Sequence, residues 1–122
     1  MDNRPFLVSG EEFKVRVEGL SAAQGAAVDD LLQELCALNR INAMAAILSA
    51  HHGWIGASFS VAEILTVLYC DPETASASPL TGSVVLGKGH AAAMQYACLA
   101  ARGAFPVEHL LRYKCPDGPQ AH

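Results

Sequence analysis

One stretch decides the expected fold, and it reads Ser83-Val84-Val85-Leu86-Gly87-Lys88-Gly89-His90-Ala91-Ala92. Its first four residues form a short β-branched and apolar run between two glycines, which is typical of a strand buried in a parallel sheet. The glycine turn leads directly into residues 91–102, an alanine-rich segment with the composition of a helix. A strand, a glycine turn and a helix in this order predict an α/β unit.

The turn also has the composition of an anion-binding site. Gly87 and Gly89 supply flexible backbone, and Lys88 and His90 supply basic side chains, all at the N-terminus of the expected helix. Free N–H groups and the helix dipole favour an anion such as phosphate at that position. The alternative is a plain connection in which the glycines serve a steric purpose and His90 caps the helix.

The rest of the chain has mainly helical periodicity. Apolar residues recur every three or four positions from Ser21 to about Ala50, which predicts a long amphipathic helix. Its expected apolar stripe consists of Val28, Leu31, Leu35, Leu38, Ile41, Ala45 and Leu48. A capping box at 60–63, Ser-Val-Ala-Glu, predicts a second helix that begins near Ser60 and buries Ile64 and Leu65. Pro106 predicts the first turn of another helix.

Residues 1–25 are expected to be an N-terminal arm or extension, and residues 26–122 to be the domain proper. The alternation Phe13-Lys14-Val15-Arg16-Val17-Glu18 has the period of a short strand, or belongs to an arm laid on another subunit. The fold class expected for the whole is α/β, mostly helical, with one or two short parallel strands. One strand makes no sheet, so a partner chain is expected to complete it.

Composition excludes several classes of function. The net charge is −4 and no Lys/Arg run is present, so we expect no nucleic-acid binding. Apolar residues make up 52% of the 122 residues and charged residues 16%, which favours a surface partly covered by another protein. The four cysteines include no Cys-x-x-Cys pair, so we expect reduced thiols rather than a zinc site. Without a leader or an apolar run of about 20 residues, a cytoplasmic protein without a membrane segment is expected.

The segment 51–54, His-His-Gly-Trp, is the second candidate for chemistry. Imidazole titrates near neutrality, so His51 and His52 could act as an acid–base pair or donate a hydrogen bond to a substrate oxygen. Histidines in loops are more often simply solvated, and no further ligands stand at the spacing of a metal site. Trp54, the one tryptophan, is more typical of a core or interface anchor than of a substrate platform.

Three segments follow one another: Gly-Ala-Ser-Phe-Ser-Val-Ala-Glu-Ile-Leu at 56–65, Val-Val-Leu-Gly-Lys-Gly-His-Ala-Ala at 84–92, and Pro-Gln-Ala-His at 119–122. Together they resemble the start of the diphosphate-binding domain of the transketolase family. That family has Gly-Gly-Ser-Leu-Ser-x-x-Asp-Ile-Leu, a strand with a Ser-Lys-Gly-His turn, and a loop that ends in Gly-His-Pro. The resemblance covers about residues 28–122, with Gly87 in place of the serine, and implies a partial thiamine diphosphate-binding fold.

The resemblance implies roles for single residues. The family histidine of the second segment contacts the cofactor diphosphate, which implies this role for His90. The last histidine of the third segment helps to bind cofactor or substrate, which implies such a role for His122, although Ala121 replaces a glycine. Another family histidine touches both cofactor and substrate. An ungapped alignment places Trp54 at its position, whereas a three-residue insertion places His51 there.

The resemblance also implies groups that this chain lacks. The family holds the diphosphate through Mg²⁺, bound by a Gly-Asp-Gly motif and a downstream asparagine, because a divalent cation must offset two phosphates. Asp117-Gly118 is the sole Asp-Gly pair, and it has no leading glycine. The glutamate that activates the thiamine ring belongs to a separate domain. We therefore expect the metal ligands and this glutamate on one or more transketolase-like partner chains.

The expected function is that of a small subunit of a split thiamine diphosphate-dependent transferase, inactive alone, which moves a ketol or acyl two-carbon unit. The turn 87–90 would hold the diphosphate, and His51, His52 and His122 would face the substrate. The alternative is a scaffold or regulatory subunit that stabilises a transketolase-like partner, and a third is a shortened piece of a longer enzyme. Trp54 in place of a histidine favours the scaffold, and the complete Gly-Lys-Gly-His turn favours the enzyme.

Overall fold

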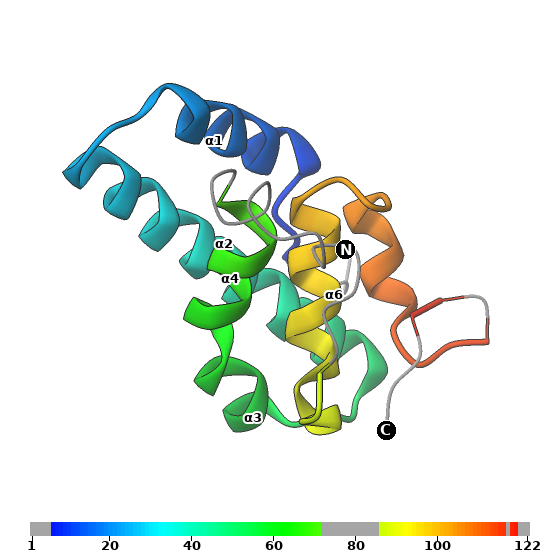
Figure 1. Cartoon of the computed structure of the whole chain (residues 1–122). Helices are drawn as coiled ribbons and strands as arrows, with labels where there is room; N and C mark the ends of the chain where they lie inside the picture. Colours follow the sequence, from blue (N-terminus) through cyan, green and yellow to red (C-terminus); the bar gives the residue numbers. More distant parts are fainter. Residues whose placement is uncertain (1–5, 72–85, 117, 120–122) are drawn as a thin grey trace.

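A computed structural model describes residues 6–71, 86–116 and 118–119, and these residues are mostly helical (Figure 1). The elements are α1 (Gly10–Ala22), α2 (Ala26–Ala50), α3 (Ile55–Ser60), α4 (Ala62–Cys70), η1 (Gly89–Ala91), α6 (Ala92–Ala101) and η2 (Val107–Arg112). The expectation of a mostly helical chain is confirmed. The described residues form no strand and so do not make an α/β fold, while Ser83–Val85 of the expected strand lie outside them.

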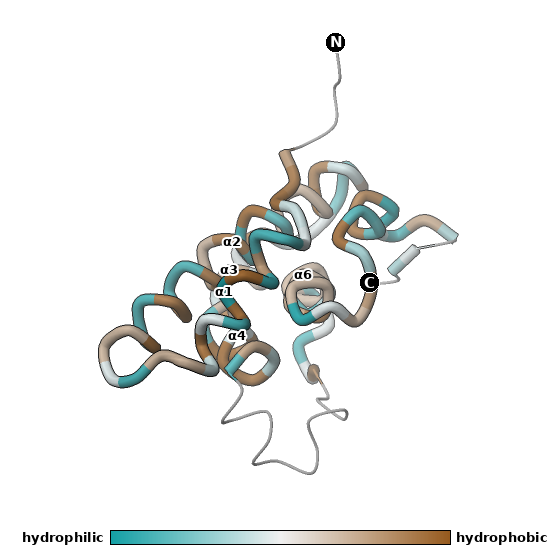
Figure 2. The backbone as a smooth tube through the Cα atoms, turned by 90° about the horizontal axis from the view of Figure 1, so that it is seen from above, coloured by the Kyte–Doolittle hydropathy of each residue, from teal (hydrophilic) through white to brown (hydrophobic). Residues whose placement is uncertain are grey.

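The long helix α2 is the centre of the fold. It packs against α1, α4, α6 and η2, and Figure 2 shows α6 end-on beside it. Both helices carry alanines that are almost completely buried, among them Ala43 and Ala46 in α2 and Ala93 and Ala97 in α6. Alanine side chains allow two helix axes to approach closely, because little side-chain volume separates the backbones. Larger side chains, Leu35 and Met94 among them, fill the space around this contact.

The buried face of α2 differs from the expected stripe. Leu35 and Ala45 are buried as expected, but Ile41 is 38% exposed and Leu48 is 51% exposed. The helix instead buries two asparagines, Asn39 and Asn42. Both can be buried because they form hydrogen bonds. The Nδ2 of Asn39 donates to Oγ1 of Thr66 in α4 (3.0 Å). A prediction from hydrophobic periodicity alone would place Asn39 and Asn42 on the exposed face of α2, whereas the structure buries them.

The N-terminal segment is a helix, so the expectation of a short strand at 13–18 was wrong. In α1, Phe13 is fully buried and Leu20 is 5% exposed, whereas Val15 is 58% exposed. Residues seven apart share one helix face, which explains this pattern. The segment before α1 is fixed by Asn42, whose Oδ1 accepts from the Val8 N–H (2.7 Å) and whose Nδ2 donates to the Val8 carbonyl (3.2 Å). This part of the chain therefore packs on its own α2.

The expected capping box does not form. The chain is already helical in α3, breaks at Val61 (φ −111°, ψ 8°) and resumes as α4. The Ser60 hydroxyl donates to the Ala57 carbonyl (3.0 Å), and Glu63 forms an ion pair with Arg40 of α2. Because Arg40 attracts the glutamate, the reciprocal bonds of a capping box are lost. Ile64, expected on the buried face of this helix, is 63% exposed.

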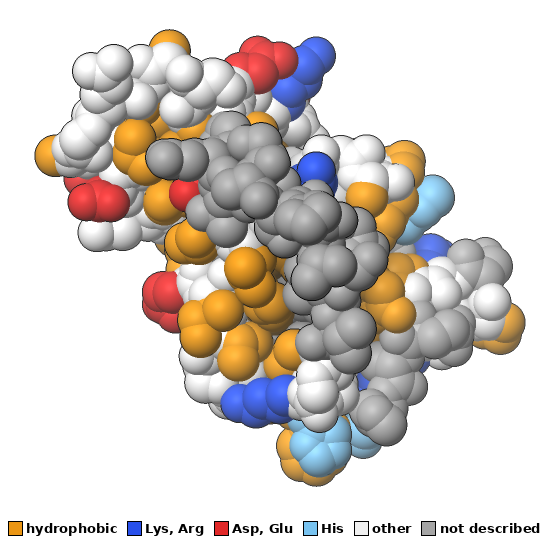
Figure 3. Space-filling view, viewed as in Figure 1, with side chains coloured by type: hydrophobic (Ala, Val, Ile, Leu, Met, Phe, Trp, Pro, Cys, Tyr) orange, Lys and Arg blue, Asp and Glu red, His pale blue; other side chains and the backbone are white. Residues whose placement is uncertain are grey.

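Several large apolar side chains are exposed. They include Phe6, Ile41, Leu48, Trp54, Ile55 and Ile64. The space-filling view shows apolar side chains grouped over the face that carries α4 and α2 (Figure 3). None of the helices in the described ranges is both long enough and apolar enough to cross a membrane.

Phe13→Ala and Val15→Ala test the helical packing of α1. Truncation of the fully buried phenylalanine should lower the free energy of unfolding by about 3–5 kcal/mol, because it leaves a cavity in the core. The matched exposed change, Val15→Ala, should alter it by less than about 0.5 kcal/mol. Urea denaturation measures both. Equal effects of the two changes would contradict the helix and favour an alternating strand.

Candidate functional site

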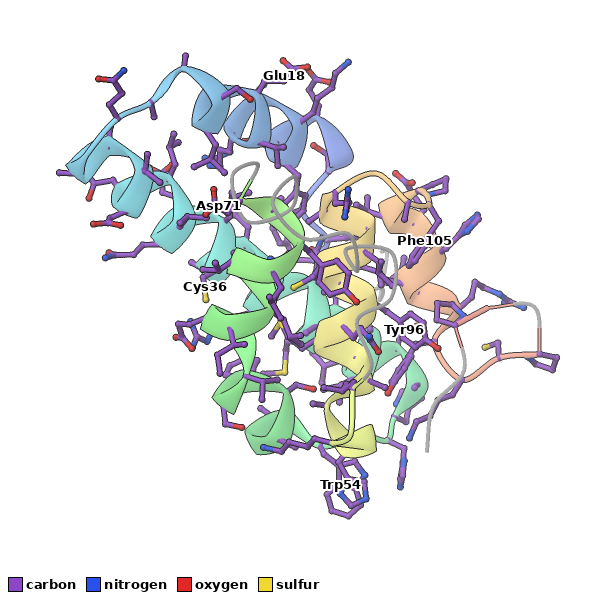
Figure 4. The ribbon with its side chains drawn as sticks, in the orientation of Figure 1. Glu18, Cys36, Trp54, Asp71, Tyr96 and Phe105 are labelled. Atoms are coloured by element: carbon purple, nitrogen blue, oxygen red, sulfur yellow. The ribbon has the colours of Figure 1, made fainter. Side chains whose placement is uncertain are left out.

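The packing of α2 and α6 brings two loops together. The short helix α3 contacts α2, α6 and η1, so the segment that follows α2 lies beside the turn that precedes α6. Figure 4 shows Trp54 at this end of the molecule, below α3 and the start of α6. The two segments singled out from the sequence, 51–54 and 87–90, are therefore neighbours in space.

Aromatic contacts join these two segments. The rings of Trp54 and His90 are stacked, with centroids 4.5 Å apart and an interplanar angle of 29°. The ring of His52 meets Trp54 edge-on, with centroids 6.3 Å apart and an angle of 77°. Trp54 remains 48% exposed, so it covers one face of the His90 imidazole without being buried itself. His90 therefore lies against Trp54, the residue that precedes α3.

Two lysines extend the group. The Nζ of Lys88 donates to Oγ of Ser60 (2.6 Å), and the Nζ of Lys114 lies 2.6 Å from Nδ1 of His52. We call the set His52, Trp54, Lys88, His90 and Lys114 the basic cluster. Its members come from the end of α2, the turn before α6 and the segment after η2. Figure 3 shows blue basic side chains and pale blue histidines close together at this end of the molecule.

Local backbone geometry directs the 51–54 loop toward the cluster. His51 ends α2 in the left-handed conformation (φ 57°), with its N–H bonded to the Leu48 carbonyl (3.2 Å). Gly53 then passes so close to α2 that an added Cβ would lie 2.8 Å from Cγ1 of Ile47. Only glycine fits there without displacing a stiff β-branched side chain. The Ser49 hydroxyl donates to the Leu111 carbonyl (2.6 Å), which ties this end of α2 to η2.

The structure brings together part of the predicted site. His52, Lys88 and His90 lie in the basic cluster, and Gly89 begins η1. Gly87 is exposed in the same turn.

The remaining site predictions have different outcomes. Trp54 stacks on His90, whereas His51 is exposed and ends α2. The N-cap residue of α6 is Ala91 rather than His90. His122 lies outside the described residues.

Sequence reasoning missed Lys114. It follows η2 and has a left-handed backbone (φ 65°), which joins it to His52 across 62 residues of sequence. The one local signal was the turn composition of residues 115–119, which predicts a bend but no partner. Ser60 was identified as a helix cap and instead accepts the bond from Lys88.

The basic cluster lies on the surface, outside three hollows that other residues line. A cavity of about 430 Å³ lies between α2 and α4, with Cys36, Arg40 and Glu63 in its wall. A second of about 700 Å³ lies between α1 and residues 100–108. A third, apolar cavity of about 370 Å³ is lined by Phe6, Ile41, Met44, Leu48 and Phe59, with Arg40 and Ala45. No residue of the basic cluster lines any of these three.

The cysteines are free thiols, as the sequence predicted. Cys36, Cys70 and Cys98 are buried, and burial raises the pKa of each thiol, to about 11 for Cys70. They are therefore protonated and unreactive near neutral pH. Within the part of the chain that is described, no three histidine, cysteine or acidic side chains group as a metal site would require.

Comparisons with models of protein families, with curated proteins and with solved structures found no match for this chain. The likeness to transketolases consequently depends on the three sequence segments alone.

Gly53→Ala tests the close approach that positions Trp54. The added methyl group must displace Ile47, so we expect a loss of about 1–3 kcal/mol in the free energy of unfolding. Gly56→Ala is the matched control, because an added Cβ there meets nothing within 4 Å and alanine favours the helix. Thermal unfolding followed by the emission of Trp54 reports both. A Gly53→Ala protein as stable as the control would show that the loop does not lie against α2.

Proposed function

We propose that this chain is the small subunit of a split thiamine diphosphate-dependent enzyme of the transketolase type, which transfers a ketol or acyl two-carbon unit. The observation that carries the proposal is the basic cluster. His52 and His90 contact the exposed Trp54, Lys114 contacts His52, and Lys88, from the same turn as His90, bonds to Ser60. Within this cluster, the ammonium of Lys88 and the imidazole of His90 are the kind of donors that suit a diphosphate.

The donors fit a diphosphate by their chemistry. Lys88 carries an ammonium group with three N–H donors, of which its bond to Ser60 uses one. The imidazole of His90, which stacks on the indole of Trp54, is a group that can donate a ring N–H to a phosphate oxygen. Hydrogen bonds from charged donors to phosphate are among the stronger polar contacts in proteins. In this proposal Lys88 and His90 bind the diphosphate, and Gly87 and Gly89 let the backbone approach it.

The proposal requires a partner chain. The basic cluster is open to solvent: its own Trp54 is 48% exposed, and the next residue in the chain, Ile55, is 40% exposed. A protein surface laid over them would exclude water and strengthen the electrostatic contacts of the site. The ligands of Mg²⁺ and the glutamate that activates the thiamine ring are assigned to this partner. The assembly would be a cytoplasmic hetero-oligomer.

In this proposal the side chains of this subunit bind the cofactor and orient the substrate. Thiamine diphosphate, when bound, supplies an electron sink for carbanion chemistry. His52 lies at the edge of Trp54 and would donate a hydrogen bond to a substrate oxygen. His51 and His122 remain proposed substrate-facing residues.

A scaffold without catalytic residues is the second candidate. The stack of Trp54 on His90 favours it, because an apolar ring then lies next to the proposed diphosphate site, where the ungapped alignment expects a histidine. The exposed apolar residues of α2 and α4 would serve a scaffold equally well. Turnover by the partner chains alone separates the two candidates: full activity without this subunit supports the scaffold.

His90→Ala tests the proposed enzyme, in the complex formed on co-expression with a transketolase-like partner chain. A hydrogen bond to a charged group contributes about 1.5–3 kcal/mol, so the affinity for thiamine diphosphate should fall at least about tenfold. Turnover should fall below detection, while size-exclusion chromatography still shows the assembled complex.

His109→Ala is the matched control, because this exposed histidine stacks on Phe105, away from the basic cluster. It should keep both affinity and turnover. Full activity of the His90→Ala complex would remove His90 from the site and, with it, the catalytic assignment.

A further inference from the structure

The contact between Lys114 and His52 has a chemical consequence for the proposed site. The Nζ of Lys114 lies 2.6 Å from Nδ1 of His52. We propose that Lys114 is a positioning residue that fixes His52 as the neutral tautomer with its hydrogen on Nε2. The role of that N–H toward a substrate rests on the proposed function, whereas the tautomer itself does not.

The tautomer follows from the donor inventory of the two groups. A lysine ammonium has three N–H donors and no acceptor. For a hydrogen bond to form, Nδ1 of His52 must therefore present a lone pair. The single ring hydrogen of the neutral imidazole then lies on Nε2, on the far side of the ring from Lys114. A doubly protonated ring would offer no acceptor and would place two like charges in contact.

Lys114 is held in place by its own turn. Its backbone is left-handed (φ 65°), and its N–H donates to the Pro119 carbonyl (2.7 Å). The turn closes tightly, since a Cβ on Gly118 would lie 2.1 Å from the Arg112 carbonyl oxygen. The ammonium group also lies over the ring of Tyr113, 5.6 Å from its centroid, and Tyr113 is buried. These contacts direct the long side chain of Lys114 toward His52.

His52 is also held in place by its neighbours. It follows the left-handed residue His51 and meets Trp54 edge-on. The bond from Ser49 to the Leu111 carbonyl joins the end of α2 to η2, and Lys114 follows Tyr113, the C-cap residue of η2. Both partners of the contact are therefore anchored to the pair α2 and η2. The Nε2–H of His52 becomes a fixed donor beside Trp54, which suits contact with a substrate oxygen.

The tautomer can be measured in the ¹⁵N-labelled chain from long-range ¹H–¹⁵N spectra of its imidazole rings, with His52→Gln to assign the signals. We expect His52 to show an unprotonated Nδ1 and a protonated Nε2. In Lys114→Met the two ring nitrogens should shift toward each other as the tautomers mix, and Lys114→Arg should keep the original pattern. Lys14→Met, at an exposed site on α1, is the control and should change nothing.

Two results would overturn the proposal: a hydrogen on Nδ1 of His52 in the unaltered chain, or ring nitrogen signals in Lys114→Met identical to those of the unaltered chain. The first needs no variant, so it decides even if Lys114→Met fails to fold.

In the assembled complex, Lys114→Met should lower kcat about tenfold with the affinity for thiamine diphosphate unchanged, and Lys114→Arg should restore most of it. An unchanged kcat would contradict the positioning role. If the complex binds no thiamine diphosphate, the proposed function fails, and the tautomer spectra still decide the role of Lys114.

Discussion

The close packing of α2 on α6 is the contact on which the rest of the structure depends. Both helices bury alanines, whose small side chains suit close helix packing. A larger side chain in place of the fully buried Ala46 or Ala97 would overpack the core, and overpacking destabilises a core. The same contact sets the position of the segments at their ends. The loop after α2 and the turn before α6 therefore meet through α3, and with them His52, Trp54 and His90.

Buried hydrogen bonds then determine which face of α2 is inside. Asn39 bonds to Thr66 of α4, and Asn42 bonds both backbone groups of Val8. A buried asparagine without such bonds would be costly, so these pairs fix the orientation of α2 relative to its neighbours. They also explain the exposure of Ile41 and Leu48, which the rotation of the helix leaves on the surface. The exposure of Ile41 and Leu48 is therefore a consequence of the buried hydrogen bonds of Asn39 and Asn42.

The sequence predicted the elements whose pattern is local. The long helix at 21–50 and the alanine-rich helix after the glycine turn appear within a few residues of their expected ends, and the segment after Pro106 is helical, as a 3₁₀ turn. The failures have tertiary causes. Residues 13–18 alternate like a strand, but burial of Phe13 against α2 makes them helical. Glu63 would complete a capping box if Arg40 did not lie opposite. Neither partner is near in sequence.

The part of the candidate site that has a local sequence signal was also predictable. Residue types and a glycine turn singled out Lys88, His90 and His52, because basic side chains in such segments suit an anion. Lys114 was not predictable, since its contact with His52 requires a left-handed backbone and a tight turn, and neither has a periodic signal. The stack of Trp54 on His90 depends on the close passage of Gly53 over Ile47.

The most direct test of the account is a crystal structure of the chain with a transketolase-like partner, thiamine diphosphate and Mg²⁺. The account predicts a diphosphate oxygen within about 3 Å of a ring nitrogen of His90. A cofactor bound elsewhere, with the stacked pair of Trp54 and His90 facing solvent, would contradict it.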